Sequence, residues 1–257
     1  MVIARAGITN MIRRRMFLGL LIFAWLPFVV RAVQIYVSTN FQQLTMLAPT
    51  AETFREFLEQ QNTFVFFVTI YAGAGLIAND RRANALQIYL SKPLMRAEYI
   101  AGKATVLFAF LMLVTWVPAV LLLVLQIMFA GSFAFFKANL FVFPAITVGA
   151  LIQVLLATFT MLALSSLSKS SRYVGILYAG IIFFTAAVFG VMYAVTGESS
   201  LSWLSLGSSL DQVVDVVFRL KPRYDTHWAV SLTVIVGLIV LSISILERRV
   251  RGVEVVT

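Results

Sequence analysis

The chain lacks cysteine and has few charged residues for its length. None of its 257 residues is cysteine, which excludes a disulfide framework and a thiolate metal site. Charged residues make up 12% and hydrophobic residues 61%, whereas a soluble domain is usually about a quarter charged and about half apolar. This composition indicates an integral membrane protein.

Motifs that would indicate enzymatic chemistry are also absent. No segment matches the GxxxxGK[ST] loop, so the chain cannot bind nucleotide phosphates in that manner by itself. The HExxH and GxSxG motifs are missing, and no other spacing of metal ligands stands out. The single histidine, His227, lies at the edge of an apolar run, where a surface residue is commoner than a ligand or base. We therefore expect no catalytic, cofactor-binding or metal-binding residue in this chain.

Six apolar runs predict helices that cross a bilayer core, which needs about 20 residues. Pro27 falls inside the first run and predicts a kink. Gly73 and Gly75, in the second, permit close contact between helices. We expect an all-α membrane protein with a single transmembrane domain over residues 1–257, whose spans are residues 16–37, 63–78, 104–130, 140–167, 173–195 and 228–246.

The basic residues predict the side of the membrane on which each loop lies. If both termini are cytoplasmic, the inner segments hold 14 Lys and Arg residues and the outer segments hold 5. Because cytoplasmic loops carry the excess of Lys and Arg, we expect a multi-pass protein of the cell inner (plasma) membrane with both termini in the cytosol. The formal net charge of +9 then follows the membrane and does not indicate a nucleic-acid partner.

Residues 2–15 predict a short amphipathic helix that lies at the membrane interface. Ala4, Ile8 and Met11 have helical spacing, and polar residues occupy the rest of the turn. This helix either borders a cytoplasmic partner or only anchors the chain. The first apolar run is too long for a signal peptide and lacks a small-residue cleavage site, so we expect it to remain in the mature protein.

Arg31 is the one charged residue inside the six runs. It lies about fifteen residues into the first run, or about 22 Å along a helix axis, and therefore near the far interface. Its side chain either extends to that interface or faces the bundle interior to meet an anionic group of a substrate. An ion-coupled carrier is disfavoured because the membrane interior otherwise lacks the ionisable residues that handle ions or protons.

Two polar stretches are expected on the outer side. Residues 38–62 predict an external interfacial helix before the second span. In residues 197–227, Gly207 divides two apolar pieces, each shorter than the ~17 residues needed to span. Asp211 and Asp215 are four residues apart and share a helical face. The pattern fits two short re-entrant helices, and two amphipathic helices on the surface are the alternative.

The stretch from Asn79 to Lys103 is the longest polar interruption on the expected inner side. It carries five basic residues against Asp80 and Glu98. A short apolar cluster inside it ends at Pro93, whose ring removes a backbone donor and disfavours helix at the preceding residue. The pattern predicts a helix of one or two turns, then a corner, then a second helix that enters the bilayer. We expect this loop to be accessible to a soluble partner.

This stretch resembles the cytoplasmic loop of ABC type-2 permeases, the six-helix membrane subunits of ABC exporters. In that family an acidic residue is followed by Gly-Thr-Leu, a run of leucines, Ser-x-Pro, an arginine and Gly-Lys. Asn84 and Ala85 replace the Gly-Thr here. The residues that match are Asp80, Leu86, Leu90, Ser91, Pro93, Arg96, Gly102 and Lys103.

The resemblance implies a permease subunit that couples ATP hydrolysis by a separate subunit to substrate translocation. Two ATPase subunits would bind the ATP and Mg²⁺, and a second permease copy or a homologous permease would complete the complex in the membrane lipid. A coupling helix would contact the ATPase, and re-entrant helices would close an external gate. The alternative is a membrane anchor that transports nothing and relays ATPase motion to periplasmic or membrane partners.

The resemblance also assigns roles to residues. Leu86, Tyr89 and Leu90 are expected to form an apolar anchor for the ATPase, with a charged rim around it. The rim arginines could instead serve only the membrane topology. The full set for ATPase coupling is Asp80, Arg81, Arg82, Leu86, Tyr89, Leu90, Pro93 and Arg96, and the candidates for a substrate path or external gate are Arg31, Trp203, Asp211 and Asp215.

Overall fold

The computed structural model describes residues 2–40, 49–83, 96–131 and 133–251. Within these ranges the chain is helical with no strand, and six helical segments are long and apolar enough to cross a membrane. This confirms the all-α fold with six spans. The segments are α2 (Arg15–Ala24) with α3 (Leu26–Asn40), α4 (Ala51–Val68) with α5 (Gly75–Arg82), α7 (Arg96–Val114) with α8 (Trp116–Ala130), α10 (Val142–Leu167), α11 (Ser171–Thr196) and α13 (Trp228–Arg251).

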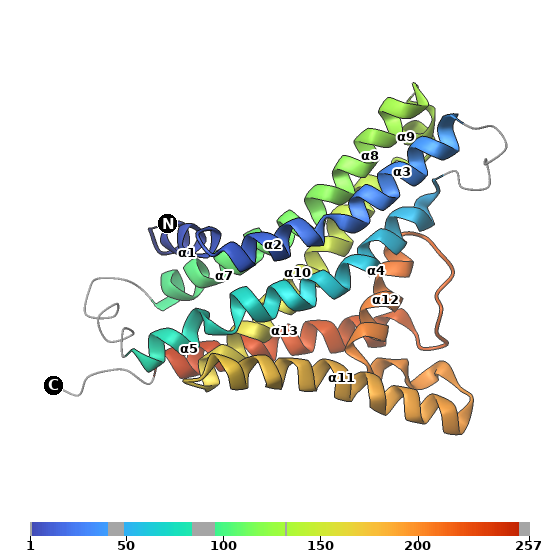
Figure 1. The fold of residues 1–257 in the computed structure, drawn as a ribbon. Coiled ribbons are helices and arrows are strands. Elements are labelled where there is room, and N and C mark those ends of the chain that lie inside the picture. The colour runs from blue at the N-terminus through green and yellow to red at the C-terminus, as the bar shows by residue number, and fades with distance from the viewer. Residues whose placement is uncertain (1, 41–48, 84–95, 132, 252–257) are drawn as a thin grey trace.

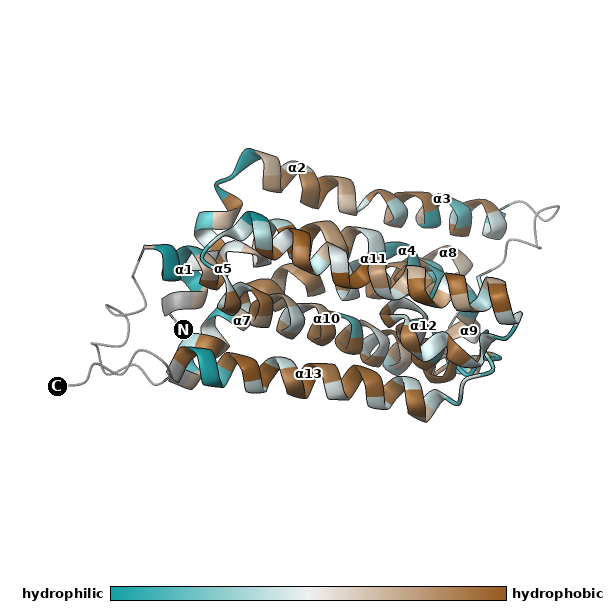
Figure 2. Cartoon of the chain, turned by 90° about the horizontal axis from the view of Figure 1, so that it is seen from below, coloured by the Kyte–Doolittle hydropathy of each residue, from teal (hydrophilic) through white to brown (hydrophobic). Residues whose placement is uncertain are grey.

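Helix α1 (Val2–Ile12), α5 and the last turn of α13 lie at the same end of the bundle (Figure 1). We call this the basic end, because it holds residues 13–15, Arg81, Arg82 and residues 248–249. The opposite end holds α9 (Ala134–Ala138) and α12 (Leu206–Val217). Hydrophilic residues gather toward the helix ends and long hydrophobic stretches lie between them, as expected for helices that cross a bilayer (Figure 2).

Three of the six segments form the interior of the bundle. In α4–α5, α7–α8 and α10, 56% of the most apolar window is buried, against 22% in α2–α3, 17% in α11 and 22% in α13. Helix α10 is central, since it packs against α4, α5, α7, α8, α11, α12 and α13. The first, fifth and sixth segments therefore leave most of their apolar surface uncovered by this chain.

The first and third segments are each interrupted for one residue. Trp25 separates α2 from α3 two residues before Pro27, and Thr115 separates α7 from α8 three residues before Pro118. A proline ring removes one backbone donor and clashes with the carbonyl four residues earlier, which explains both positions. The helix axis is therefore interrupted next to Pro27, where the sequence predicted a kink.

The external helix predicted within residues 38–62 is not a separate element. Helix α4 begins after Thr50, whose side chain forms a capping box with Thr53, and it continues through the π-helix η2 (Thr69–Gly73) into α5. The whole segment, Ala51–Arg82, has 32 residues. No glycine or proline interrupts α4, and the protein itself supplies partners for Arg55, Glu56 and Glu59, so nothing ends the helix at the predicted boundary.

Of the two glycines predicted to permit close contact, Gly73 does so between helices. A Cβ atom there would lie 2.5 Å from Cγ of Met161 on α10 and 2.8 Å from Cδ2 of Leu107 on α7. A Cβ atom at Gly75 would instead meet the side chain of Asn79, one turn along the same helix, at 2.4 Å. Only Gly73 therefore brings the second segment close to its neighbours.

Candidate functional site

At the basic end, α5 and α7 are joined by an ion pair. The chain leaves α5 at Arg82 and returns in α7, and the predicted coupling residues lie at the end of α5, at the start of α7 and in the sequence between them. Asp80 accepts a 2.8 Å hydrogen bond from the hydroxyl of Tyr99 and lies 2.7 Å from Nζ of Lys103. Both partners are on α7, so these contacts connect the helices on either side of residues 84–95.

The two arginines that follow Asp80 have different surroundings. Arg81 donates to the backbone carbonyl of Ser166, at the end of α10, whereas Arg82 is exposed. Arg81 therefore also links α5 to α10. The other predicted coupling residues, namely the side chain of Arg96 and the residues Leu86, Tyr89, Leu90 and Pro93, lie outside the described part of the chain.

Ser165 makes a second connection between α10 and α5. Its hydroxyl accepts from the backbone N–H groups of Ile77, at 3.1 Å, and Ala78, at 3.0 Å, and donates to the carbonyl of Ala74 at 2.9 Å. The hydroxyl thus inserts into the hydrogen-bond ladder of α5, directly after the π-helix. No sequence motif pointed to Ser165, because its role depends on a distorted turn almost ninety residues away.

Helix α1 packs on its own chain. Ile8 and Met11 contact the core at the basic end, and a Cβ atom at Gly7 would lie 2.7 Å from Cγ2 of Val106 on α7. Its other face lines an open hollow of about 510 Å³ that includes Arg5 and Arg13. The amphipathic helix is present with its polar face uncovered by the described chain, and whether that face borders a partner stays a prediction.

At the opposite end, seven charged residues form a group that we call the polar cluster. Arg31 lies on α3, and its Nη2 atom is 2.9 Å from Oε2 of Glu56 on α4. Arg31 also donates to Gln34, at 3.0 Å, and to Gln60, at 3.3 Å. Its side chain is only 11% exposed and is held between neighbouring helices, and which of its two predicted roles applies stays a prediction. The members are Arg31, Arg55, Glu56, Glu59, Asp211, Asp215 and Arg223.

The centre of the polar cluster is the ion pair between Arg55 on α4 and Asp215 on α12. Nε of Arg55 lies 2.6 Å from Oδ1 of Asp215, and both side chains are almost fully buried. Arg55 also contacts Glu59 at 2.7 Å, one turn along α4. Arg223, from the loop after α12, binds both carboxylate oxygens of Glu59, at 2.8 and 3.0 Å. The cluster thus joins α4 to α12 and to the loop that follows it.

Asp211 is the carboxylate of the polar cluster whose charge is least compensated. Among the described residues it forms no ion pair within 4 Å, although it lines the same small cavity as Arg55 and Glu59. Burial raises the pKa of Asp211 from 3.8 to about 7; the charges of Glu59 and Asp215 add to this, and Arg55 opposes it. Burial also raises the pKa of Asp215, which Arg55 partly offsets. The cluster therefore contains a carboxyl group that titrates near neutral pH.

The elements before the last span form a hairpin, and the break in it is not at Gly207. The 3₁₀-helix η3 (Ser199–Leu204) is followed by Ser205, whose hydroxyl accepts from the backbone N–H of Ser208 at 3.2 Å and caps α12. A serine cap satisfies a free donor, so α12 begins one residue before Gly207 and contains it. Trp203 lies on η3 with 38% of its surface exposed.

The side chain of Gln212 holds the returning loop against α12. Its amide nitrogen donates to the carbonyls of Tyr224, at 3.0 Å, and Thr226, at 2.6 Å, and its oxygen accepts from the backbone N–H of Tyr224. Helix α12 packs among α4, α10, α11 and α13 rather than lying on the surface of the bundle. The hairpin is therefore a folded unit inserted at the opposite end.

The comparison with known families assigns the chain. No curated protein matches it significantly. A family model described as "ABC-2 family transporter protein" matches residues 1–250, which is nearly the whole chain. Members of this family are the multi-pass membrane component of ABC transporters and associate with an ABC ATPase. Since the match covers far more than half of the sequence, the chain belongs to the ABC-2 transporter family and is a permease component.

Proposed function

We propose that this permease couples ATP hydrolysis by two separate ATPase subunits to export of a substrate across the cell inner membrane. Both termini and the basic end face the cytosol, in keeping with the excess of Lys and Arg there. The ATPase subunits bind ATP and Mg²⁺ and contact the residues between α5 and α7. The observation that carries the proposal is that Asp80, Tyr99 and Lys103 join the bases of these two helices, so that force on the intervening residues acts on both.

The contacts of α5 offer a route from the ATPase to the rest of the bundle. Arg81 and Ser165 connect α5 to the end of α10, the central helix. Helix α5 is also continuous, through η2, with α4, which carries Arg55 and Glu59 of the polar cluster. A displacement of the basic end is therefore transmitted through packed helices to the opposite end, where α12 and its loop act as the external gate.

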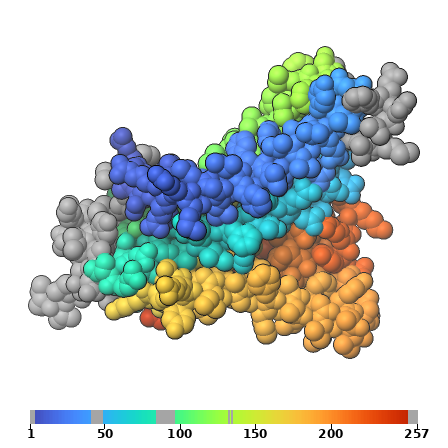
Figure 3. All heavy atoms as spheres, in the orientation of Figure 1, coloured from blue at the N-terminus to red at the C-terminus, as the bar shows by residue number. Residues whose placement is uncertain are grey.

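A second permease copy or a homologous permease covers the face formed by α2–α3 and α11. Figure 3 shows both segments on one face of the molecule, with α4–α5 between them. Both expose large apolar side chains, among them Ile22, Val30, Phe184 and Val191, each at least 60% exposed. Membrane lipid covers the remaining apolar surface. The substrate path would then lie between two copies, near the gate candidates Arg31, Trp203, Asp211 and Asp215.

The proposal is tested by replacing Leu86 and Leu90 with aspartate and measuring how much ATPase subunit co-purifies with the permease. We expect the double variant to lose the ATPase, because a buried charge in an apolar anchor has no partner. Leu140→Asp is the matched control, since Leu140 is 60% exposed at the opposite end. Co-purification that is equal in the double variant and in the control would contradict the assignment.

A second measurement distinguishes export from the anchor alternative. The complex is reconstituted in vesicles and the ATP-dependent movement of candidate amphiphiles is followed. Transport that stops when the ATPase is inactivated supports export. An intact, ATP-hydrolysing complex that moves none of them, but whose turnover depends on an added periplasmic subunit, would favour a membrane anchor.

A further inference from the structure

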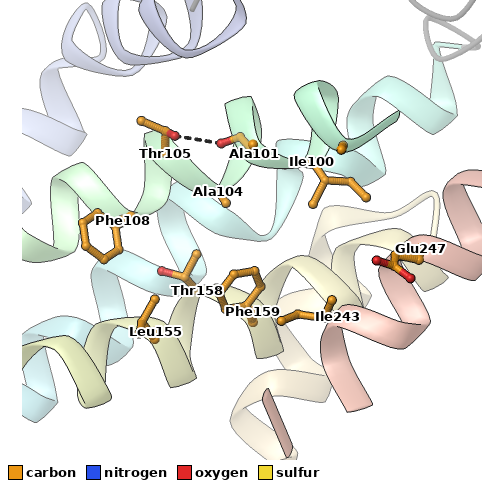
Figure 4. Close-up of a pocket in the computed structure, with 11 residues that line it drawn as sticks. Ile100, Ala101, Ala104, Thr105, Phe108, Leu155, Thr158, Phe159, Ile243 and Glu247 are labelled. Carbon is orange, nitrogen blue, oxygen red and sulfur yellow. Dashed lines mark hydrogen bonds between the residues drawn. The ribbon is translucent and has the colours of Figure 1, made fainter. Parts of the chain in front are cut away.

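A cavity of about 590 Å³ lies between three spans near the basic end, away from the polar cluster. Helix α10 contributes its floor, and α7 and α13 form its two walls. Figure 4 shows side chains from all three helices pointing into the same space. Both walls pack more extensively against α10 than against each other, which leaves the cavity between them.

The lining of the cavity is apolar along its length and acidic at its mouth. Most lining side chains are aliphatic, aromatic or alanine, including Ile100, Phe108, Leu155 and Ile243. Among the eleven lining residues, Glu247 alone is charged, and it is exposed near the end of α13. A mostly apolar cavity with a few polar groups is typical of a small-molecule site.

The length of the cavity corresponds to one leaflet of the bilayer. Its lining on α7 runs from Ala97 to Phe108, a rise of about 16 Å at 1.5 Å per residue. Half of a hydrocarbon core of ~30 Å is about 15 Å. A cavity of this length that begins at a helix end suits an acyl chain lying parallel to the helices.

Thr158 supplies an independent sign of a ligand. It lines the cavity from α10, it is 1% exposed, and its hydroxyl has no hydrogen-bond partner in the described part of the chain. The hydroxyl of Thr105, which also lines the cavity, already donates to the carbonyl of Ala101 at 2.8 Å. A buried hydroxyl without a partner is costly, so Thr158 is suited to donate to an oxygen of a bound molecule, such as a lipid ester.

We propose that this cavity binds one phospholipid of the cytoplasmic leaflet, with an acyl chain between α7 and α13 and an amine-bearing headgroup at Glu247. The carboxylate of Glu247 accepts from the ammonium group and selects against anionic headgroups. The unpartnered Thr158 hydroxyl donates to an ester oxygen. The site lies in a single copy of the chain, so it does not depend on the ATPase or on the proposed transport function.

The test is native mass spectrometry of the purified full-length chain in detergent, with added phosphatidylethanolamine or phosphatidylglycerol of the same acyl chains. We expect one phosphatidylethanolamine to be retained, with about tenfold preference over phosphatidylglycerol, as suits one charge-assisted hydrogen bond. Glu247→Gln should abolish the preference and leave some binding. Equal retention of both lipids by the wild-type chain would overturn the headgroup assignment.

Filling the cavity tests the place of the acyl chain. Ala104→Phe should remove the retained lipid, because its ring occupies the space between α7 and α10, and Ala101→Phe, at the exposed rim, should do the same if the first variant fails to fold. Ala194→Phe, on the exposed side of α11, is the matched control and should keep the lipid. Retention that is unchanged in a folded cavity variant would show that the lipid binds elsewhere.

Discussion

At the residue scale, the polar cluster shows how a membrane protein accommodates charges at one end of its bundle. Three arginines and three carboxylates form ion pairs between 2.6 and 3.5 Å, and the pairs join α3, α4 and α12. Burying such groups costs several kcal/mol for each ion unless partners are well placed. The folded hairpin after α11 therefore depends on charges supplied by α4.

Breaking the central pair should destabilise the protein strongly. Arg55→Met leaves Asp215 buried without its main partner, and loss of one partner of a buried pair costs about 3–5 kcal/mol. Thermal unfolding in detergent measures this. The double variant Arg55→Met with Asp215→Leu should recover most of the loss, because no lone buried charge remains. A double variant no more stable than the single one would argue that the pair does not act as a unit.

Asp211 should make stability depend on pH. Its pKa is raised to about 7 in the folded chain, so the folded state binds a proton more tightly than the unfolded state. The free energy of unfolding then falls as the pH rises from about 4 to about 7, and it levels off above pH 7. Asp211→Asn should melt at a higher temperature than the wild type above pH 7, with the difference vanishing near pH 4. A difference that is the same at every pH would contradict the raised pKa.

The sequence could show which of these residues are unusual, but it could not show which residues they contact. Arg31 stood out because it lies within an apolar run, yet its partner Glu56 is 25 residues away, in a helix that was predicted to be separate. The spacing of Asp211 and Asp215 predicted a shared face correctly. The sequence did not reveal that Arg55 is the partner of Asp215, because pairing across helices depends on packing that periodicity does not encode.

At the element scale, apolar runs predicted the helices well and their ends less well. The six runs correspond to six helical segments, because each span must satisfy its backbone hydrogen bonds internally. Hydropathy predicted that the second helical segment begins at residue 63. Helix α4 begins earlier, after the Thr50 cap, and its first turns contain the polar residues Glu52, Glu56 and Glu59. The π-helix Thr69–Gly73 was not predicted at all, because the apolar pattern does not distinguish it from an ordinary helix turn.

The contact between α10 and α5 should depend on the hydroxyl of Ser165. Ser165→Ala leaves the buried N–H groups of Ile77 and Ala78 without that partner, at an expected cost of about 1–3 kcal/mol. The melting temperature in detergent measures the effect. Ser166→Ala is the control, since among the described residues its hydroxyl bonds only to the carbonyl of Ala163 in its own helix. Equal melting temperatures for the two variants would show that the Ser165 hydroxyl does not stabilise the contact between α10 and α5.

At the scale of the whole molecule, the fold separates two polar ends by an apolar bundle. The basic end carries α1, α5 and the end of α13, and the opposite end carries the polar cluster and the α12 hairpin (Figure 1). The six spans and the family were predictable from hydropathy and the loop pattern. The substrate was not, because an apolar, phenylalanine-rich bundle suits lipids, drugs, peptides and lipid-linked sugars alike.

The most direct test of the account is to ask what touches the residues between α5 and α7. A photoreactive phenylalanine analogue replaces Tyr89 in one variant and Phe133, 62% exposed at the opposite end, in another. Both are illuminated in membranes that contain the ABC ATPase partner. The account predicts that the analogue at position 89 forms a covalent adduct with the ATPase and that the one at position 133 does not. An adduct only from position 133, or from neither, would contradict it.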